Sequence, residues 1–202
     1  LETRGQTLEE QQVNLTAAQA NRTLAVTQLD QSIRSNSAQL KQKEQDRQQL
    51  EDLLQAIEEA IVDLEVPATY ATFDSAQGNM AGPVEGKQSN QFGRSRNAGK
   101  MQWQGITIAA KEGTTVKAIH HGRVVYADWL RGSGLLLIID HGDGYMSLYA
   151  HNESLLREVG EWVTAGSPIS TVGNSGGMEQ TAVYFEVRHN GKPTNPANWC
   201  KR

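Results

Sequence analysis

The first 64 residues contain no proline and no aromatic residue, and only one of the chain's 19 glycines. Proline and glycine interrupt helices, so their scarcity permits a single long helix in this part of the chain. The same stretch has six Lys or Arg against eleven Asp or Glu, a net charge of −5, whereas the remainder has 13 against 12. These differences predict an acidic helix joined to a glycine-punctuated, β-rich globular part.

The sequence also lacks a basic excess, a long apolar run and a second cysteine. A formal net charge of −4 gives no indication of a nucleic-acid partner, and no apolar run is long enough to cross a bilayer. Cys200 can form no disulfide within the chain, and one thiol does not distinguish redox compartments. Because the chain begins at Leu1 without Met or a signal peptide, we expect a fragment or processed product whose targeting information is missing.

Residues 8–64 follow a sustained three-four alternation in which eleven of 17 seam positions are apolar. Such a heptad pattern predicts a coiled coil over residues 1–65 as part of a longer coil, and the heptad stretch 8–64 alone would extend roughly 85 Å. The seam is weakened by polar residues, of which Asn36 can fix a register. The coil either self-associates or pairs with an arm from the missing N-terminal sequence. We favour the second because the chain begins inside the repeat.

The heptads stop at Pro67, and residues 66–86 are rich in small residues, glycine and proline. This composition predicts a linker. The segment nevertheless contains Tyr70, Phe73 and Met80, which a solvated tether would not need. We therefore interpret it as a linker or restraining arm, part of which lies back on the globular domain.

Residues 87–202 consist of short β-prone runs separated by glycine turns, which predicts an antiparallel sandwich or barrel with one core. The run "TAVYFEVR" alternates with a period of two. That period points Val183, Phe185 and Val187 to the core. It places Tyr184 and Arg188, together with Ala182 and Glu186, on the opposite face.

The order of these runs resembles the M23 (LytM, lysostaphin-like) zinc peptidase domain. The motifs that carry the resemblance are "QFGRSR", "WQGITIAAKEGTTVKAIHHGRVVYADW", "GSGLLLIIDHGDGYMSLYAH", "VGEWVTAGSPISTVGNSGG" and "YFEVRHNGKPTNPANW". Many short motifs in one order are more specific than any single motif. The resemblance implies an α + β chain whose second part is an all-β LytM/M23-like domain, a duplicated hybrid motif with a long groove used on peptidoglycan peptides.

In that family a histidine and an aspartate four residues apart, with the second histidine of a His-x-His strand, hold zinc. The resemblance places Trp103 and Thr107 at the first two positions, and Ala182 and Tyr184 at the two His-x-His positions. None of these is a suitable zinc ligand. Only His151, at the end of "LYAH", retains a histidine of the catalytic set. The resemblance therefore implies a domain that is not an enzyme and has no zinc or other cofactor.

The other histidines offer little basis for a rebuilt zinc site. We expect His120 and His121, on a connection before Gly122, to face solvent, and His141 to lie at a turn outside the groove. His189 comes directly after the alternating run "TAVYFEVR". The glycine-rich stretch 173–177 fits no phosphate-loop pattern and is interpreted as a groove-edge loop.

Without the metal, the groove persists as a shape, and its composition is that of a protein-binding surface. The expected lining residues are Trp103, Gln104, Thr107, Tyr149, His151, Tyr184 and Arg188, with Ser133 and Leu136 at one side. Trp103 either contributes to binding or fills the space that the metal leaves. A binding role is favoured for Tyr184 and Arg188, because the alternation of the strand places both side chains on the face that points away from the core.

A coiled coil followed by a metal-free LytM domain resembles the EnvC-type murein hydrolase activators of Gram-negative bacteria. This resemblance implies a periplasmic protein at the division septum, whose coil docks on the FtsEX transporter complex. It also implies that the groove binds and activates N-acetylmuramoyl-L-alanine amidases, with peptidoglycan nearby. We expect residues 66–80, or the end of the preceding helix, to cover the groove in the resting state.

Three other functions stay open from the sequence. The first is a zinc-dependent M23 endopeptidase with an unusual site. The second is a periplasmic adaptor, because "VGEWVTAGSPISTVG" also resembles the pattern of lipoyl-like domains. The third is a peptidoglycan-binding stalk without an activating role.

Overall fold

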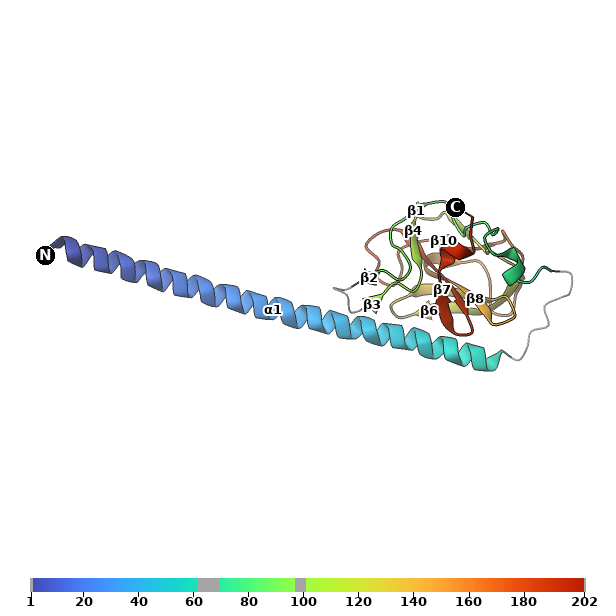
Figure 1. The fold of residues 1–202 in the computed structure, drawn as a ribbon, viewed down its shortest axis with the longest axis horizontal. Coiled ribbons are helices and arrows are strands. Elements are labelled where there is room, and N and C mark those ends of the chain that lie inside the picture. Colours follow the sequence, from blue (N-terminus) through green and yellow to red (C-terminus); the bar gives the residue numbers. More distant parts are fainter. Residues whose placement is uncertain (1, 62–69, 97–100, 202) are drawn as a thin grey trace. The chain divides into compact units, whose positions relative to one another are not determined.

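The computed structural model describes residues 2–61, 70–96 and 101–201. Its contacts divide the chain into two compact units, residues 1–45 and residues 46–202. Helix α1 (Glu2–Ala60) is continuous across this boundary (Figure 1). The prediction of one N-terminal helix followed by a β-sheet domain is confirmed. Because the sheet-bearing unit begins at Asp46, the last turns of α1 belong to it rather than to the first unit.

The described residues of the first unit are the part of α1 that precedes Asp46. Leu15, Val26, Leu29 and Ile33 are 53–61% exposed, although all four occupy heptad seam positions. Apolar side chains in a regular seam need a partner helix to be buried, so the coiled coil remains a prediction about a further helix. Across the described ranges, no helix is both long enough and apolar enough to span a membrane.

The second unit contains twelve strands and two short 3₁₀ helices among its described residues. The strands are β1 (Lys87–Gln88), β2 (Ser95–Arg96), β3 (Met101–Gln102), β4 (Ile106–Ala109), β5 (Thr115–Lys117), β6 (Gly122–Leu130), β7 (Gly134–Asp140), β8 (Tyr145–Leu155), β9 (Trp162–Val163), β10 (Pro168–Val172), β11 (Ala182–His189) and β12 (Lys192–Thr194). The 3₁₀ helices are η1 (Asp74–Ala76) and η2 (Pro196–Asn198).

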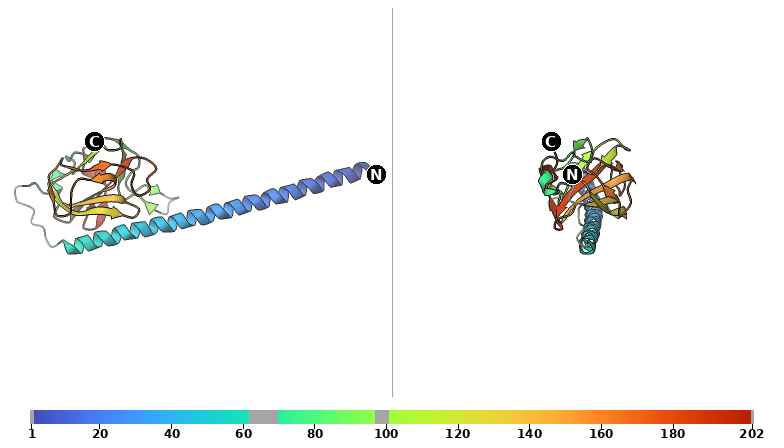
Figure 2. Two further views of the ribbon diagram at one scale, coloured as in Figure 1. Left: turned by 180° about the vertical axis from the view of Figure 1, so that it is seen from behind. Right: turned by 90° about the vertical axis from the view of Figure 1, so that its right-hand side faces the viewer.

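Ten of these strands form one antiparallel sheet, whose main path is β1-β4-β11-β8-β7-β6-β9. Strands β5 and β10 pair with each other, β10 also pairs with β8, and β12 pairs with β11, while β2 and β3 form a separate hairpin. Two further views show the strands curving around a common interior (Figure 2). Strand β11 is central, because it pairs with β4 on one side and β8 on the other.

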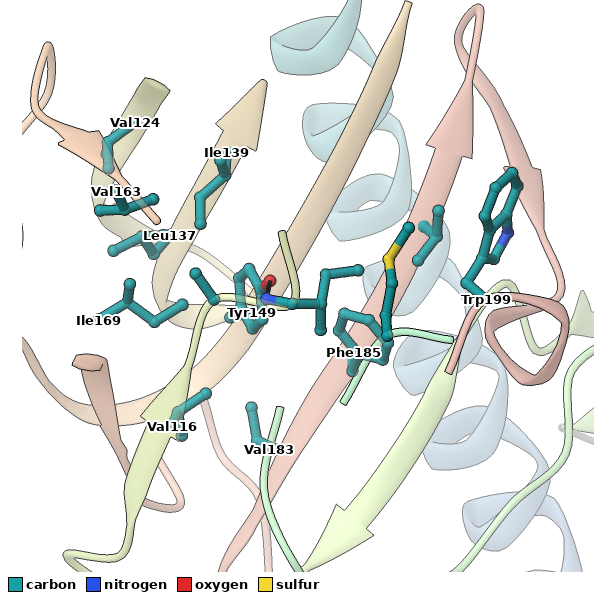
Figure 3. Close-up of a cluster of buried hydrophobic side chains, with 14 of the residues drawn as sticks. Val116, Val124, Leu137, Ile139, Tyr149, Val163, Ile169, Val183, Phe185 and Trp199 are labelled. Atoms are coloured by element: carbon teal, nitrogen blue, oxygen red, sulfur yellow. Dashed lines mark hydrogen bonds between the residues drawn. The ribbon is translucent and has the colours of Figure 1, made fainter. Parts of the chain in front are cut away.

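One face of the sheet is the main core, shown in Figure 3. As the alternation predicts, Val183, Phe185 and Val187 of β11 are fully buried there. Side chains from β5 to β10 also belong to the cluster, among them Leu137 and Tyr149, and Trp199 lies at its edge near the C-terminus. Aliphatic and aromatic side chains on successive strands thus bury one continuous apolar surface.

Residues 70–86 pack onto this core and do not form a solvated linker. Phe73, at the start of η1, is fully buried and stacks on His141 and Tyr145 with ring centroids 4.7 and 4.9 Å apart. Met80 is buried and pairs with Cys200 in an isolated parallel bridge. The apolar residues in this segment are therefore anchors, whereas residues 66–69 lie outside the described residues.

The opposite face of the sheet is also covered, and its cover is the end of α1. Leu54 packs into a cluster with Leu136 and Ile138 of β7 and with Met146, Leu148 and Ala150 of β8. Leu50, Leu53, Ile57 and Ile61 pack around it. We call residues 46–61 the cover segment, and the β7, β8 and β11 side that bears Leu136, Leu148, Ala150, Tyr184 and Arg188 the covered face.

Candidate functional site

The covered face brings together the residues expected at former metal positions on β4 and β11. Thr107 lies directly opposite Tyr184, and Tyr184 lies opposite Ala150 of β8. Gly105 makes room for the tyrosine ring, since a Cβ there would lie 2.9 Å from Tyr184 Cζ and 2.4 Å from the Phe185 carbonyl oxygen. The Tyr184 ring consequently lies close against the backbone beside the turn into β4. Ala182, two residues earlier on β11, is buried.

Trp103 follows β3 and is half-buried beneath an arginine. The Arg96 guanidinium carbon lies 4.4 Å from the centre of the Trp103 ring, within the range of a cation–π interaction. Trp103 also lines a polar cavity of about 440 Å³, with Gln88, Ser89, Asn90, Gln91, Arg94 and Ser95. The neighbouring Gln104 is half-buried in the connection to β4.

His151 lies on β8 at an irregularity of the sheet. Its φ of 65° is left-handed, and the register of β7 against β8 shifts between Leu135 and Leu137. The His151 amide donates to the Ser133 carbonyl at 2.8 Å, and its Nδ1 lies 2.9 Å from the Ser175 carbonyl oxygen. The expected groove-edge loop 173–177 and Ser133 therefore both contact His151. Its ring centre is 6.4 Å from that of Tyr184, and burial lowers the pKa of His151.

Tyr149 does not line the groove, in contrast to the prediction. It lies opposite Phe185, is fully buried in the main core, and its hydroxyl accepts hydrogen bonds from the Ile119 amide and the Ser147 hydroxyl. Two-residue parity with His151 would place both side chains on one face. The left-handed residue and register shift at His151 break that parity.

Ionisable side chains form a buried network on the covered face. The Tyr184 hydroxyl donates to Glu186 Oε2 at 2.7 Å, and Arg188 Nη1 lies 3.4 Å from Glu186 Oε1. From the cover segment, Glu51 accepts two hydrogen bonds from Arg188 Nη2, at 2.8 and 3.1 Å. Arg188 Nε donates to the Gly191 carbonyl at 3.1 Å. One guanidinium thus faces two carboxylates.

Glu186 and Arg188 are almost free of solvent, whereas the Glu51 side chain is 26% exposed. Glu186 is 0% and Arg188 3% exposed, and within the described residues Glu186 Oε1 and Arg188 Nη1 make no hydrogen bond. Burial raises the pKa of Glu186 to about 7, although Arg188 and the Tyr184 hydroxyl act in the opposite direction; Glu51 raises it further. Burial, followed by Glu186, raises the pKa of Tyr184 well above its ordinary value, so the phenol stays protonated.

Two of the residues expected to line the groove lie beneath the cover segment. Arg188 and Leu136 are 3% and 1% exposed because the cover segment lies over them. The expectation that residues 66–80 cover the groove is wrong for their described part, because Phe73 packs in the main core cluster. The alternative, cover by the end of the preceding helix, agrees with the contacts of Glu51 and Leu54.

The expectation that His120 and His121 face solvent is also wrong. They are 5% and 6% exposed because the returning segment covers them, with Tyr70 stacked on His121 at 4.4 Å and Phe73 against His120 at 5.2 Å. His141 is buried beside them after β7. In the part of the chain that the structure describes, no three His, Cys, Asp or Glu side chains are grouped to hold a metal ion.

Several residues of the network have weak or no sequence signals. Glu186 shares the parity of Tyr184 and Arg188 in "YFEVR", so its face was predictable, but its buried pairing was not. Glu51 and Leu54 resemble other helix residues in sequence. Their contact with β7, β8 and β11 depends on where the chain turns back after α1, and no local pattern encodes this.

Comparisons with known proteins agree with this architecture. The profile of Peptidase family M23 matches residues 101–196. The chain is 46% identical over 126 residues to "Murein hydrolase activator EnvC" of Escherichia coli K12, a match that covers 62% of this chain and 30% of that protein. It is 43% identical over 118 residues to "Murein hydrolase activator NlpD" of the same strain, covering 58% and 30%.

A solved structure of a zinc-containing peptidase from Vibrio cholerae has the same fold. It superposes with a TM-score of 0.57 at 22% identity, over 61% of this chain and 40% of that one. The chain spans about a third of the length of the two activators it matches. The residues matched by the family profile lie within the β-domain, residues 87–202.

Proposed function

We propose that this chain, whose residues 101–196 match the profile of peptidase family M23, uses a former peptidase groove to bind and activate a peptidoglycan amidase. Its relatives EnvC and NlpD are named murein hydrolase activators. The observation that carries the proposal is that the chain's own cover segment occupies the face of Tyr184 and Arg188. A surface that accepts an amphipathic helix through apolar contacts and a buried ion pair has the character of a protein-binding site.

The residues at the former metal positions do not fit zinc. Trp103 has no lone pair to offer and lies against the Arg96 cation. The Tyr184 hydroxyl donates to Glu186 and stays protonated, so it is not available as a phenolate ligand. Thr107 and Ala182 supply a hydroxyl and a methyl group. We therefore propose a non-catalytic domain, and no step of its mechanism requires a metal or another cofactor.

In the proposed mechanism, the amidase competes with the cover segment for the covered face. The partner would pack on Tyr184 and Leu136 and pair with Arg188, and the contact energy would offset removal of an inhibitory segment from the amidase's own site. Binding requires the uncovered state, so the equilibrium between the covered and uncovered states sets the activity.

The remaining parts of the proposal concern regulation and place. We propose that the heptads of α1 pair in a coiled coil which docks on the FtsEX complex, and that movement of this coil withdraws the cover segment. The setting is the periplasm of a Gram-negative bacterium at the division septum, close to peptidoglycan. The exposed seam of α1 supports the pairing of the coil with another helix.

The Glu51–Arg188 ion pair allows a test from both sides. Glu51→Ala and Arg188→Ala each break the same contact and weaken the cover. In an assay of purified amidase on dye-labelled sacculi, we expect Glu51→Ala to activate more strongly than wild type and Arg188→Ala to activate hardly at all. Tyr184→Ala should resemble Arg188→Ala, and thermal melts would verify folding. Equal activation by well-folded Arg188→Ala, Tyr184→Ala and wild type would refute the groove assignment.

A further inference from the structure

The cover segment adds a negative charge to a site that is already neutral. Without it, β11 presents Arg188 and Glu186, one positive and one negative charge that are 3.4 Å apart. When it closes, Glu51 places a second carboxylate on the same guanidinium, 2.8 Å from Nη2. An unbalanced charge in a dry site is costly unless a proton neutralises it.

Among the described residues, Arg188 is the cation that pairs with Glu186. On β11 its titratable neighbours are Tyr184 and Arg188, and on the cover segment Glu51. On β8 its opposite residue is Leu148, flanked by Met146 and Ala150, none of which ionises. Arg96 of β2 interacts electrostatically with Tyr184 and His151, and its guanidinium lies over Trp103.

We propose that closure of the cover segment takes up one proton on Glu186, so that acid favours the covered state and alkali favours release. Protonated Glu186 still accepts the hydrogen bond from Tyr184, while Arg188 and Glu51 remain as a balanced pair. On release, Glu186 is rehydrated, loses its proton and pairs with Arg188. The inference rests on the proposed function only in that the cover segment leaves this face.

The direction of the pH effect, and the pH range in which it occurs, follow from the pKa of Glu186 in the covered and uncovered states. Covered Glu186 has a pKa of about 7, whereas an exposed glutamate has a pKa of about 4.3. The covered state therefore binds more protons between these values. Over that range the ratio of covered to uncovered molecules should fall by up to about tenfold for each pH unit, and above pH 7 it should level off.

The experiment measures cover in the chain alone, without an amidase. Nitroxide labels at Ala56→Cys and Ala165→Cys, both exposed positions, in a Cys200→Ala background report the distance between the cover segment and the β-domain. Pulsed electron resonance at several pH values from 5.5 to 8.5 gives the covered fraction. Parallel measurements with an added Leu54→Ala substitution weaken the apolar contact so that both states are populated.

We expect the covered fraction to decrease as the pH rises to 7, and this dependence to disappear in Glu186→Gln, which is isosteric and cannot ionise. Glu51→Gln should reduce it without abolishing it, because the second carboxylate is then gone while the burial of Glu186 remains. Glu59→Gln is the matched control, an exposed carboxylate on the same helix that should retain the wild-type dependence.

A covered fraction that is constant with pH in both the wild-type and the Leu54→Ala backgrounds would overturn the proposal. So would a dependence that survives in Glu186→Gln, since the proton would then bind elsewhere. These outcomes are separate from the amidase assay at fixed pH. An intact pH response with no amidase activation would reject the proposed function and leave the proton uptake standing.

Discussion

Leu54 is the side chain that most directly separates the covered from the uncovered state. It is 4% exposed and contacts apolar residues of both β7 and β8. Leu54→Ala removes three buried carbons, worth about 2.4 kcal/mol at about 0.8 kcal/mol each. Alanine is the best helix former, so α1 itself should remain intact. The covered state should lose roughly 50-fold in population relative to the uncovered state.

The assay is amidase activation on labelled sacculi over a range of activator concentrations. If the partner binds only uncovered molecules, its apparent affinity scales with their fraction. The concentration of Leu54→Ala that gives half-activation should therefore be as much as about 50-fold lower than that of wild type. Leu24→Ala, which changes an exposed leucine of the same helix, is the control and should behave as wild type.

The result that would refute this reasoning is an unchanged half-activating concentration while the spin-label distances show that the cover segment has moved away. The covered face would then not be where the partner binds. A weaker activation by Leu54→Ala would have the same meaning, because it would show that Leu54 contacts the amidase and does not exclude it.

Three further predictions concern stability and metal. Phe73→Ala should lower the unfolding free energy by about 3–5 kcal/mol and the Tm by about 10 °C in calorimetry, while Tyr70→Ala, which alters a 42% exposed residue, should cost much less. Burial lowers the pKa of His141 to about 3, below that of an unfolded histidine. Its contribution to stability should be complete above pH 6.5 and fall by up to about 1.4 kcal/mol per pH unit below it, a slope that urea titrations should find reduced in His141→Gln. Metal analysis of the purified protein should find no stoichiometric zinc, and tightly bound zinc together with digestion of sacculi by the chain alone would support the peptidase alternative.

The sheet domain and its parity were largely predictable from sequence. The alternation in "TAVYFEVR" correctly placed Phe185 and its neighbours in the core, because a residue's face on a regular strand depends only on its position. The resemblance placed Tyr149 in the groove with His151. Of these two residues only His151 reaches that face, because its left-handed backbone departs from the alternation of β8 that keeps Tyr149 in the core. Irregularities of this kind depend on neighbouring strands and leave no periodic trace in one sequence.

Contacts between distant segments were the less predictable part. His120 and His121 are buried only because residues 70–73 return to cover them, and Arg188 is buried only because Glu51 reaches it from α1. The heptad pattern alone predicts that residues 46–61 continue the coiled coil. That residues 46–61 pack on the sheet depends on the tertiary structure. The aromatic residues of the linker indicated only that the chain after the helix returns to the globular domain.

The anchoring of Phe73 has a consequence for how long activation lasts. The cover segment ends at Ile61, and the chain is fixed again in the core only twelve residues later. A released segment is therefore tethered beside its site, where a short tether gives an effective concentration on the order of millimolar. Under the proposed mechanism an amidase must outcompete this built-in ligand, and rebinding restores the resting state without dilution or degradation. Activation should thus persist only while a force or a partner keeps the segment away.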